Sequence, residues 1–142
     1  MQVVRSVGAV IAGAIVILVL VAILGLVGGV IFGALPDPET KAFREDANIV
    51  GLSAWNVLWY FPVTMLGAWL AAVIAGRRPM MHAAVIAALI LIGGVVYMLA
   101  GADAYEDVAV PPWYLPLLPV TGFLGAMTGG ALRARSKRSP AP

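Results

Sequence analysis

The chain has 142 residues, of which 62% are apolar and only 11% are charged, with a formal net charge of +2. Water-soluble domains are about 45–50% apolar and about 25% charged, so a soluble fold could not bury this much apolar surface. The chain contains no cysteine and one histidine, His82, which excludes disulfides, thiolate metal sites and multi-histidine metal sites within one chain.

Four long apolar runs predict an all-α membrane protein. A helix needs about 20 apolar residues to cross the hydrocarbon core, and runs without Asp, Glu, Lys or Arg cover about residues 7–35, 55–75, 80–100 and 113–132. Continuous runs, in which polar residues do not alternate with apolar ones, favour helices over a β-barrel. We therefore expect a single integral membrane domain over residues 1–142, with four transmembrane helices in an up-down bundle.

The charged residues between the runs predict the direction of the helices. All seven acids lie in the loops 36–54 and 101–112, whereas most basic residues lie in segments without acids. These basic residues are Arg5, Arg77, Arg78 and, in the tail 133–142, Arg133, Arg135, Lys137 and Arg138. Because cytoplasmic loops carry the excess of Lys and Arg, we expect both termini on the cytoplasmic side of a bacterial inner membrane.

Two pairs of similar segments predict a tandem duplication of a two-helix hairpin. PVTMLGAW (Pro62–Trp69) in the second run is similar to PVTGFLGAM (Pro119–Met127) in the fourth, with one residue inserted. GAVIA (Gly8–Ala12) in the first run is similar to AAVIA (Ala83–Ala87) in the third. Two hairpins of the same orientation would be related by a pseudo-two-fold axis along the membrane normal. The alternative is a chance match between alanine- and glycine-rich helices.

Small residues spaced four apart predict close helix packing, because they let backbones approach where no hydrophobic effect drives association. The glycines concerned are Gly25, Gly29 and Gly33 in the first run. In the fourth run they form two series, Gly125 with Gly129, and Gly122 with Ala126 and Gly130. These surfaces exceed what one four-helix bundle needs, so a further membrane subunit or a second copy is expected to dock there. Packing within the bundle alone is the alternative.

Prolines at matching positions of the two repeats predict a path for a solute. Pro62 and Pro119 are each followed two residues later by a threonine, Thr64 and Thr121. A proline leaves a backbone carbonyl without its donor and bends the helix, and breaks at matching positions of two repeats mark binding sites in transporters. The alternative is that the prolines lie near helix starts and that the threonine hydroxyls bond to their own helices.

His82 and the basic residues are the remaining candidates for a site. His82 could ligate a heme or a chlorophyll-type pigment, touch a lipid phosphate, or serve only as a polar residue at the headgroup boundary. The basic set (Arg77, Arg78, Arg133, Arg135, Lys137 and Arg138) is expected to meet anionic lipid headgroups, or to act only as a topology signal. We predict no metal site and no nucleic-acid partner.

The sequence contains no catalytic constellation. No charged residue lies within the four runs, and there is no HExxH motif, Ser/His/Asp set or phosphate loop. Ion-coupled pumps and proton relays almost always need an ionisable residue inside the membrane. We therefore predict that the protein is not an enzyme.

One block of the chain resembles a known group of proteins. GAWLAAVIAGRRPMMHAAVIAALILIGGV (Gly67–Val95), followed by Pro-Pro-Trp-Tyr and a last apolar run that ends in arginine, resembles small four-helix inner-membrane proteins of bacteria. That group has no assigned function, so the resemblance implies no functional residues. The small multidrug-resistance exporters share the size, but this chain lacks their glutamate in the first helix. The small fluoride channels also share the size, but their polar pore residues have no match here.

Three functions are consistent with these patterns. The first is a structural or accessory subunit that packs against other membrane proteins, in a respiratory or photosynthetic complex. The second is a small homo-oligomeric transporter or channel for a neutral or lipid-like solute. The third is a subunit that binds heme or a pigment through His82.

Overall fold

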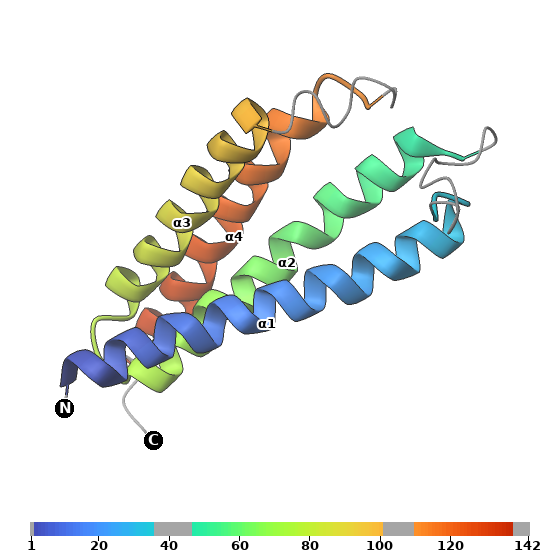
Figure 1. Ribbon diagram of the computed structural model, residues 1–142. Helices are drawn as coiled ribbons and strands as arrows, with labels where there is room; N and C mark the ends of the chain where they lie inside the picture. The colour runs from blue at the N-terminus through green and yellow to red at the C-terminus, as the bar shows by residue number, and fades with distance from the viewer. Residues whose placement is uncertain (1, 36–46, 101–109, 138–142) are drawn as a thin grey trace.

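The computed structural model describes residues 2–35, 47–100 and 110–137, and all regular structure in these ranges is helical (Figure 1). The helices are α1 (Gln2–Ile31), α2 (Ile49–Ala75), α3 (Pro79–Ala100) and α4 (Tyr114–Ser136). All four are long and apolar enough to cross a membrane, so the prediction of an all-helical protein with four helices of membrane-spanning length is confirmed. The seven acids and Arg138 lie outside the described residues.

Local chemistry explains where α2 and α3 begin and end. α2 starts earlier than the apolar run indicates because Asn48 caps it, and the side-chain oxygen of Asn48 accepts a hydrogen bond from the Gly51 N–H at 2.8 Å. α2 ends at Gly76, whose φ of 76° is left-handed and whose N–H donates to the Ala72 carbonyl. Pro79 then opens α3, in the first helical position that proline tolerates. The connection between the two helices is therefore very short.

The helices α2 and α4 form the centre of the bundle. α1 packs on α2, α3 packs on α4 and less extensively on α2, and α1 hardly touches α4 in the described part of the chain. Figure 1 shows α3 and α4 lying along each other, with α1 alongside α2. α2 therefore contacts both α1 and α4. Because α1 and α4 hardly touch, side chains of α2 line a space between them.

Close backbone approach fixes α1 on α2. A Cβ added at Gly13 would lie 2.6 Å from the carbonyl oxygen of Gly67 and 2.9 Å from the Cβ of Ala71. Farther along α1, the indole Nε1 of Trp55 donates a hydrogen bond to the Leu24 carbonyl at 3.0 Å. Small residues that let backbones meet, and polar side chains that bond across helices, are the usual means of helix association in membranes.

The glycines predicted to form packing surfaces on α4 are covered by neighbouring helices. Gly125 and Gly129 face α2, where a Cβ at Gly129 would lie 2.9 Å from the backbone nitrogen of Trp69. Gly122 lies against the ring of Tyr60, also on α2. These three glycines therefore take part in packing within the bundle, which is the alternative to docking of another subunit that the sequence left open.

The corresponding glycines of the first run have a different environment. A Cβ at Gly25 or at Gly33 would have no neighbour within 4 Å, whereas Gly29 is covered by the side chain of Leu35. Gly33 follows the end of α1 with a left-handed φ of 63°, so its role is to turn the chain rather than to continue a packing face. Within the described residues, the uncovered glycine inside α1 is therefore at Gly25, with Gly8 a second one nearer the N-terminus.

One end of the bundle, here named the basic end, gathers the positive charges. It comprises Arg5, Arg77, Arg78, Arg133, Arg135 and Lys137. The Arg5 Nε donates to the Ile74 carbonyl at 2.9 Å, and the Lys137 Nζ donates to the Gly76 carbonyl. These bonds bring the start of α1, the end of α2 and the end of α4 together. Cations near the C-terminus of a helix also complement its dipole.

Candidate functional site

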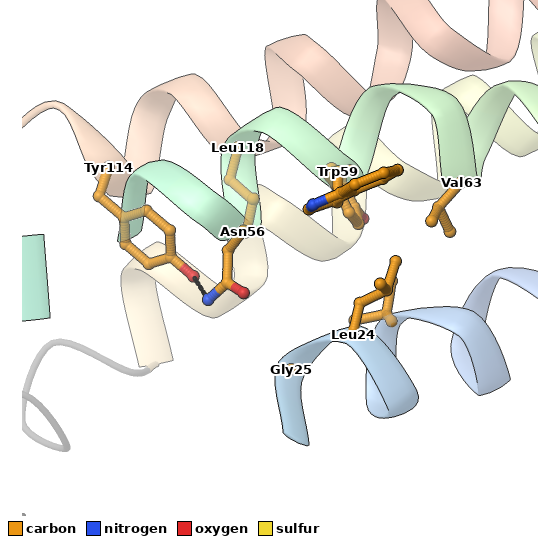
Figure 2. Close-up of a pocket in the computed structure, with 9 residues that line it drawn as sticks. Leu24, Gly25, Asn56, Trp59, Val63, Tyr114 and Leu118 are labelled. Carbon is orange, nitrogen blue, oxygen red and sulfur yellow. Dashed lines mark hydrogen bonds between the residues drawn. The ribbon is translucent and has the colours of Figure 1, made fainter. Parts of the chain in front are cut away.

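A pocket of about 130 Å³ lies between α1, α2 and α4, in the half of the bundle away from the basic end (Figure 2). It exists because α1 and α4 hardly touch, so that the face of α2 between them is not covered. The nine residues that line it are Val21, Leu24, Gly25, Asn56, Trp59, Tyr60, Val63, Tyr114 and Leu118.

Most of the pocket wall is apolar. Leu24 of α1 and Val63 of α2 lie toward one end, and the indole ring of Trp59 lies between them and the polar end (Figure 2). Gly25 contributes no side chain, and a Cβ there would meet nothing within 4 Å. The wall therefore offers contacts to a hydrocarbon chain, and the glycine provides the room for it.

The other end of the pocket carries neutral polar groups. The Asn56 Nδ2 donates a hydrogen bond to the Tyr114 hydroxyl at 3.3 Å, and Figure 2 shows these two side chains meeting. Tyr60 also lines the pocket, and its hydroxyl makes no hydrogen bond within the described part of the chain. The oxygen of the Asn56 amide can accept further hydrogen bonds, and the hydroxyls of the two tyrosines can accept or donate them.

The chemistry of the lining limits the ligand that the pocket can hold. None of the nine lining residues is charged, and burying an unpaired charge is far more costly than burying a hydrogen-bonded neutral group. The volume equals that of about four water molecules at roughly 30 Å³ each, which is enough for a short segment of a chain. The pocket is partly open, so the rest of a longer molecule can extend out of it. A neutral amphiphile fits this arrangement.

The structure places Pro62 and Thr64 away from this pocket. Thr64 is fully buried (0% exposed), and its hydroxyl donates to the carbonyls of Tyr60 and Phe61 at 2.8 and 3.0 Å. The same side chain is pressed against Gly125 of α4. The hydroxyl therefore bonds to its own helix at the α2–α4 contact.

Pro119 and Thr121 have different neighbours from Pro62 and Thr64, the matching residues of the similar segment in α2. Pro119 is buried, and a Cβ at Gly94 of α3 would lie 2.5 Å from the Pro119 Cβ. The Thr121 hydroxyl donates to the Leu117 carbonyl at 2.8 Å, and Thr121 is only partly buried. Neither of the two described pockets is lined by Pro62, Thr64 or these two residues, so a solute path along them stays a prediction.

His82 is packed into the bundle rather than placed beside a pocket. The side chain is 2% exposed, and its Nδ1 lies 3.1 Å from the Arg78 carbonyl. Because a carbonyl only accepts, Nδ1 is the donor in this bond. Nε2 is buried without a partner in the described structure, and His82 lines neither of the two described pockets. The expectation that it ligates a heme or a pigment stays a prediction.

Among the basic residues, Arg78 and Lys137 come together at a second, more open pocket at the basic end. The Nε of Arg133 is buried without a hydrogen-bond partner in the described structure. Arg135 is exposed. The Arg77 guanidinium donates to the Gln2 side-chain oxygen.

The residues of the pocket on α2 have a spacing that the sequence alone could have indicated. Asn56, Trp59, Tyr60 and Val63 are spaced i, i+3, i+4 and i+7, which places them on one face of a helix. The amide of Asn56 at the start of this series is the signal, because a polar side chain on an apolar helix needs a partner. The sequence analysis did not single out these four residues as a site.

Comparisons of this chain with models of protein families, with curated proteins and with solved structures find no match. The function is therefore argued from the pocket and from the charges alone.

Proposed function

We propose that this protein is a non-enzymatic, multi-pass protein of a bacterial inner membrane that binds a neutral, lipid-like molecule in the pocket between α1, α2 and α4. The observation that carries the proposal is the division of one pocket into an apolar part beside Trp59 and a neutral polar part at Asn56 and Tyr114. An amphiphile with an uncharged head and a hydrocarbon chain is complementary to both parts.

The proposed orientation places the pocket in the outer half of the membrane. The basic end gathers the described arginines and Lys137, and the positive-inside rule assigns such an end to the cytoplasm. The helices then run up and down with both termini inside. Tyr114 and Trp113 lie at the opposite end, where aromatic rings favour the membrane interface. The polar part of the pocket would therefore meet lipids at headgroup level.

A duplicated hairpin accounts for the position of the pocket. In this proposal α1 with α2 corresponds to α3 with α4, and the packing of α1 on α2 and of α3 on α4 supports it. A symmetric bundle would also pack α1 on α4 as α3 packs on α2. That contact is nearly missing in the described structure, and the pocket lies where it would be. A lipid-like molecule would reach the pocket sideways from the bilayer, between α1 and α4.

A photoreactive probe tests this proposal. The purified protein, in a mild detergent, is incubated with a diacylglycerol that carries a diazirine in its acyl chain, and the labelled peptides are identified by mass spectrometry. We expect labelling of the α2 segment that contains Trp59. Gly25→Leu adds four carbon atoms to the pocket wall and should reduce this labelling at least tenfold.

Gly8→Leu is the matched control for this experiment. Gly8 lies on the same helix, and a Cβ there also meets nothing within 4 Å, but Gly8 does not line the pocket. Labelling should therefore persist in Gly8→Leu. Equal labelling in both variants would show that the probe does not occupy the pocket, and the proposed function would then be rejected.

A second candidate is an accessory subunit of a larger membrane complex. The specific observation in its favour is the exposure of α1, which is held mainly by α2 and leaves Gly25 and many large apolar side chains uncovered. Small residues on an uncovered helix suit the approach of another helix. Gentle extraction from native membranes followed by native mass spectrometry tests it. Stoichiometric foreign subunits would support this function, and a homogeneous single-chain species would refute it.

A further inference from the structure

A groove of about 380 Å³ lies at the basic end, between the start of α3 and the end of α4, separate from the pocket described above. The residues that line it are Arg78, Pro79, Met80, Met81, Ala134 and Lys137. Two of these side chains are cationic, and the other four are apolar. The lining of the groove therefore combines positive charge with apolar side chains.

The positive charges around the groove have no counter-ion within the described chain. All seven acids lie in the segments 36–46 and 101–109, outside the described residues, so no described side chain supplies a carboxylate here. The bonds that the cations make are to neutral oxygens, as in the bond from Lys137 to the Gly76 carbonyl. Hydrogen bonds to carbonyls do not cancel charge. Within the described residues, this end therefore carries an unpaired positive charge that an anion can complement.

The backbone at Arg78 is held in a conformation that fixes the edge of the groove. Arg78 has a φ of 48°, which L-residues other than glycine rarely adopt. Its carbonyl accepts hydrogen bonds from the His82 Nδ1 at 3.1 Å and from the Met81 N–H at 3.0 Å. Such conformations persist when the surroundings determine them and are frequent at ligand sites. The buried His82 side chain is thus one of the groups that hold this turn.

We propose that this groove binds the phosphate of an anionic phospholipid in the cytoplasmic leaflet, with Arg78 and Lys137 on either side of the phosphate. The first turn of α3 adds the positive end of its helix dipole. The side chains of Met80 and Met81 are flexible and polarisable, and they suit the glycerol and upper acyl chain. The apolar part of the lining favours a lipid over a free phosphate ion, which would leave this surface uncovered.

Lipid-dependent thermal stability tests the proposal. The full-length protein in a neutral detergent is titrated with dioleoylphosphatidylglycerol, with dioleoylphosphatidylcholine and with inorganic phosphate, and unfolding is followed by tryptophan fluorescence. We expect stabilisation by phosphatidylglycerol alone. Arg78→Gln and Lys137→Gln should each weaken apparent binding about fivefold, the equivalent of about 1 kcal/mol for each charge near the surface.

Arg135→Gln provides the matched control, because it removes the same charge from an exposed residue of the same end that does not line the groove. The proposal expects Arg135→Gln to bind phosphatidylglycerol with less than a twofold change. If Arg135→Gln weakens binding as much as Arg78→Gln, a diffuse surface potential acts instead, and the groove is not a site. Equal stabilisation by inorganic phosphate would also overturn the proposal, since the ligand would then be a free anion. This site is distinct from the outer pocket, so either proposal can fail alone.

Discussion

The substitution Gly13→Ala tests how α1 is attached to the bundle. The added Cβ would lie 2.6 Å from the Gly67 carbonyl oxygen and 2.9 Å from the Ala71 Cβ. Both neighbours are backbone or a short side chain, and neither can rotate away. The two helices must therefore separate by several tenths of an ångström. We expect Gly13→Ala to loosen the attachment of α1 and to lower the free energy of unfolding.

The size of the expected loss in the free energy of unfolding follows from comparing Gly13→Ala with Gly25→Ala on the same helix. Both substitutions replace glycine by alanine inside α1, where the helix propensity of alanine is about 1 kcal/mol better, so this gain cancels between them. A Cβ at Gly25 has no neighbour within 4 Å. The difference that remains is the cost of overpacking at Gly13, which is about 1–3 kcal/mol. Gly13→Ala should be less stable than Gly25→Ala by this amount.

Reversible unfolding by SDS in mixed micelles, followed by tryptophan fluorescence, measures this difference. Trp55 reports directly on α1, because its indole nitrogen bonds to the Leu24 carbonyl. The expected difference corresponds to a factor of about 5 to 150 in the unfolding equilibrium. If the two variants unfold at the same SDS concentration, the close approach at Gly13 and Gly67 does not hold α1, and the explanation of the pocket fails with it.

Three further predictions concern residues buried between helices. Gly129→Ala should destabilise the α2–α4 contact by about 1–3 kcal/mol, because the added carbon meets the backbone of α2, and SDS unfolding checks it against the wild type. His82→Ala removes a buried ring and its bond to a turn carbonyl, so the melting temperature should fall, with a loss of about 2 kcal/mol. Thr64→Val removes a fully buried hydroxyl whose one proton is shared between two carbonyls and should cost about 0.5–1.5 kcal/mol, while Thr121→Val at a partly buried position should cost about 0.5 kcal/mol or less. Equal losses in the two threonine variants would contradict the different environments described for them.

The number of helices and their ability to span a membrane could be predicted because both depend on the length of each continuous apolar run. A run of about 20 apolar residues is sufficient to specify a span, and the four observed helices follow the four runs. The start of α2 at Ile49 was missed because the predicted boundary followed hydropathy. The cap at Asn48 was the available signal, since asparagine before an apolar run is a preferred N-cap.

Which faces of the helices meet could not be predicted, and the pocket depends on this. In a soluble helix the apolar stripe marks the buried face, but in a membrane the lipid-facing and protein-facing sides are both apolar. Gly25 and Gly125 illustrate the problem. Both belong to series of glycines spaced four apart, yet Gly125 is pressed against α2 whereas Gly25 borders an open pocket.

The similarity between the two segments was also insufficient to locate a binding site. Thr64 and Thr121 occupy matching positions of the two similar segments, but Thr64 is fully buried at the α2–α4 contact, whereas Thr121 is only partly buried. Their surroundings differ because α4 has neighbours on two sides, α2 and α3, while α1 lies apart from it. Similarity between two segments reflects their residue types, but it does not specify which helices each segment packs against.

The central claim is that the pocket between α1, α2 and α4 holds a neutral, lipid-like molecule. The most direct test is native mass spectrometry of the protein extracted gently from its own membrane, with identification of the lipids that remain bound. We expect one neutral lipid per chain in the wild type and in Gly8→Leu, and its loss in Gly25→Leu. Retention of the same neutral lipid by Gly25→Leu, or of none by the wild type, would contradict it.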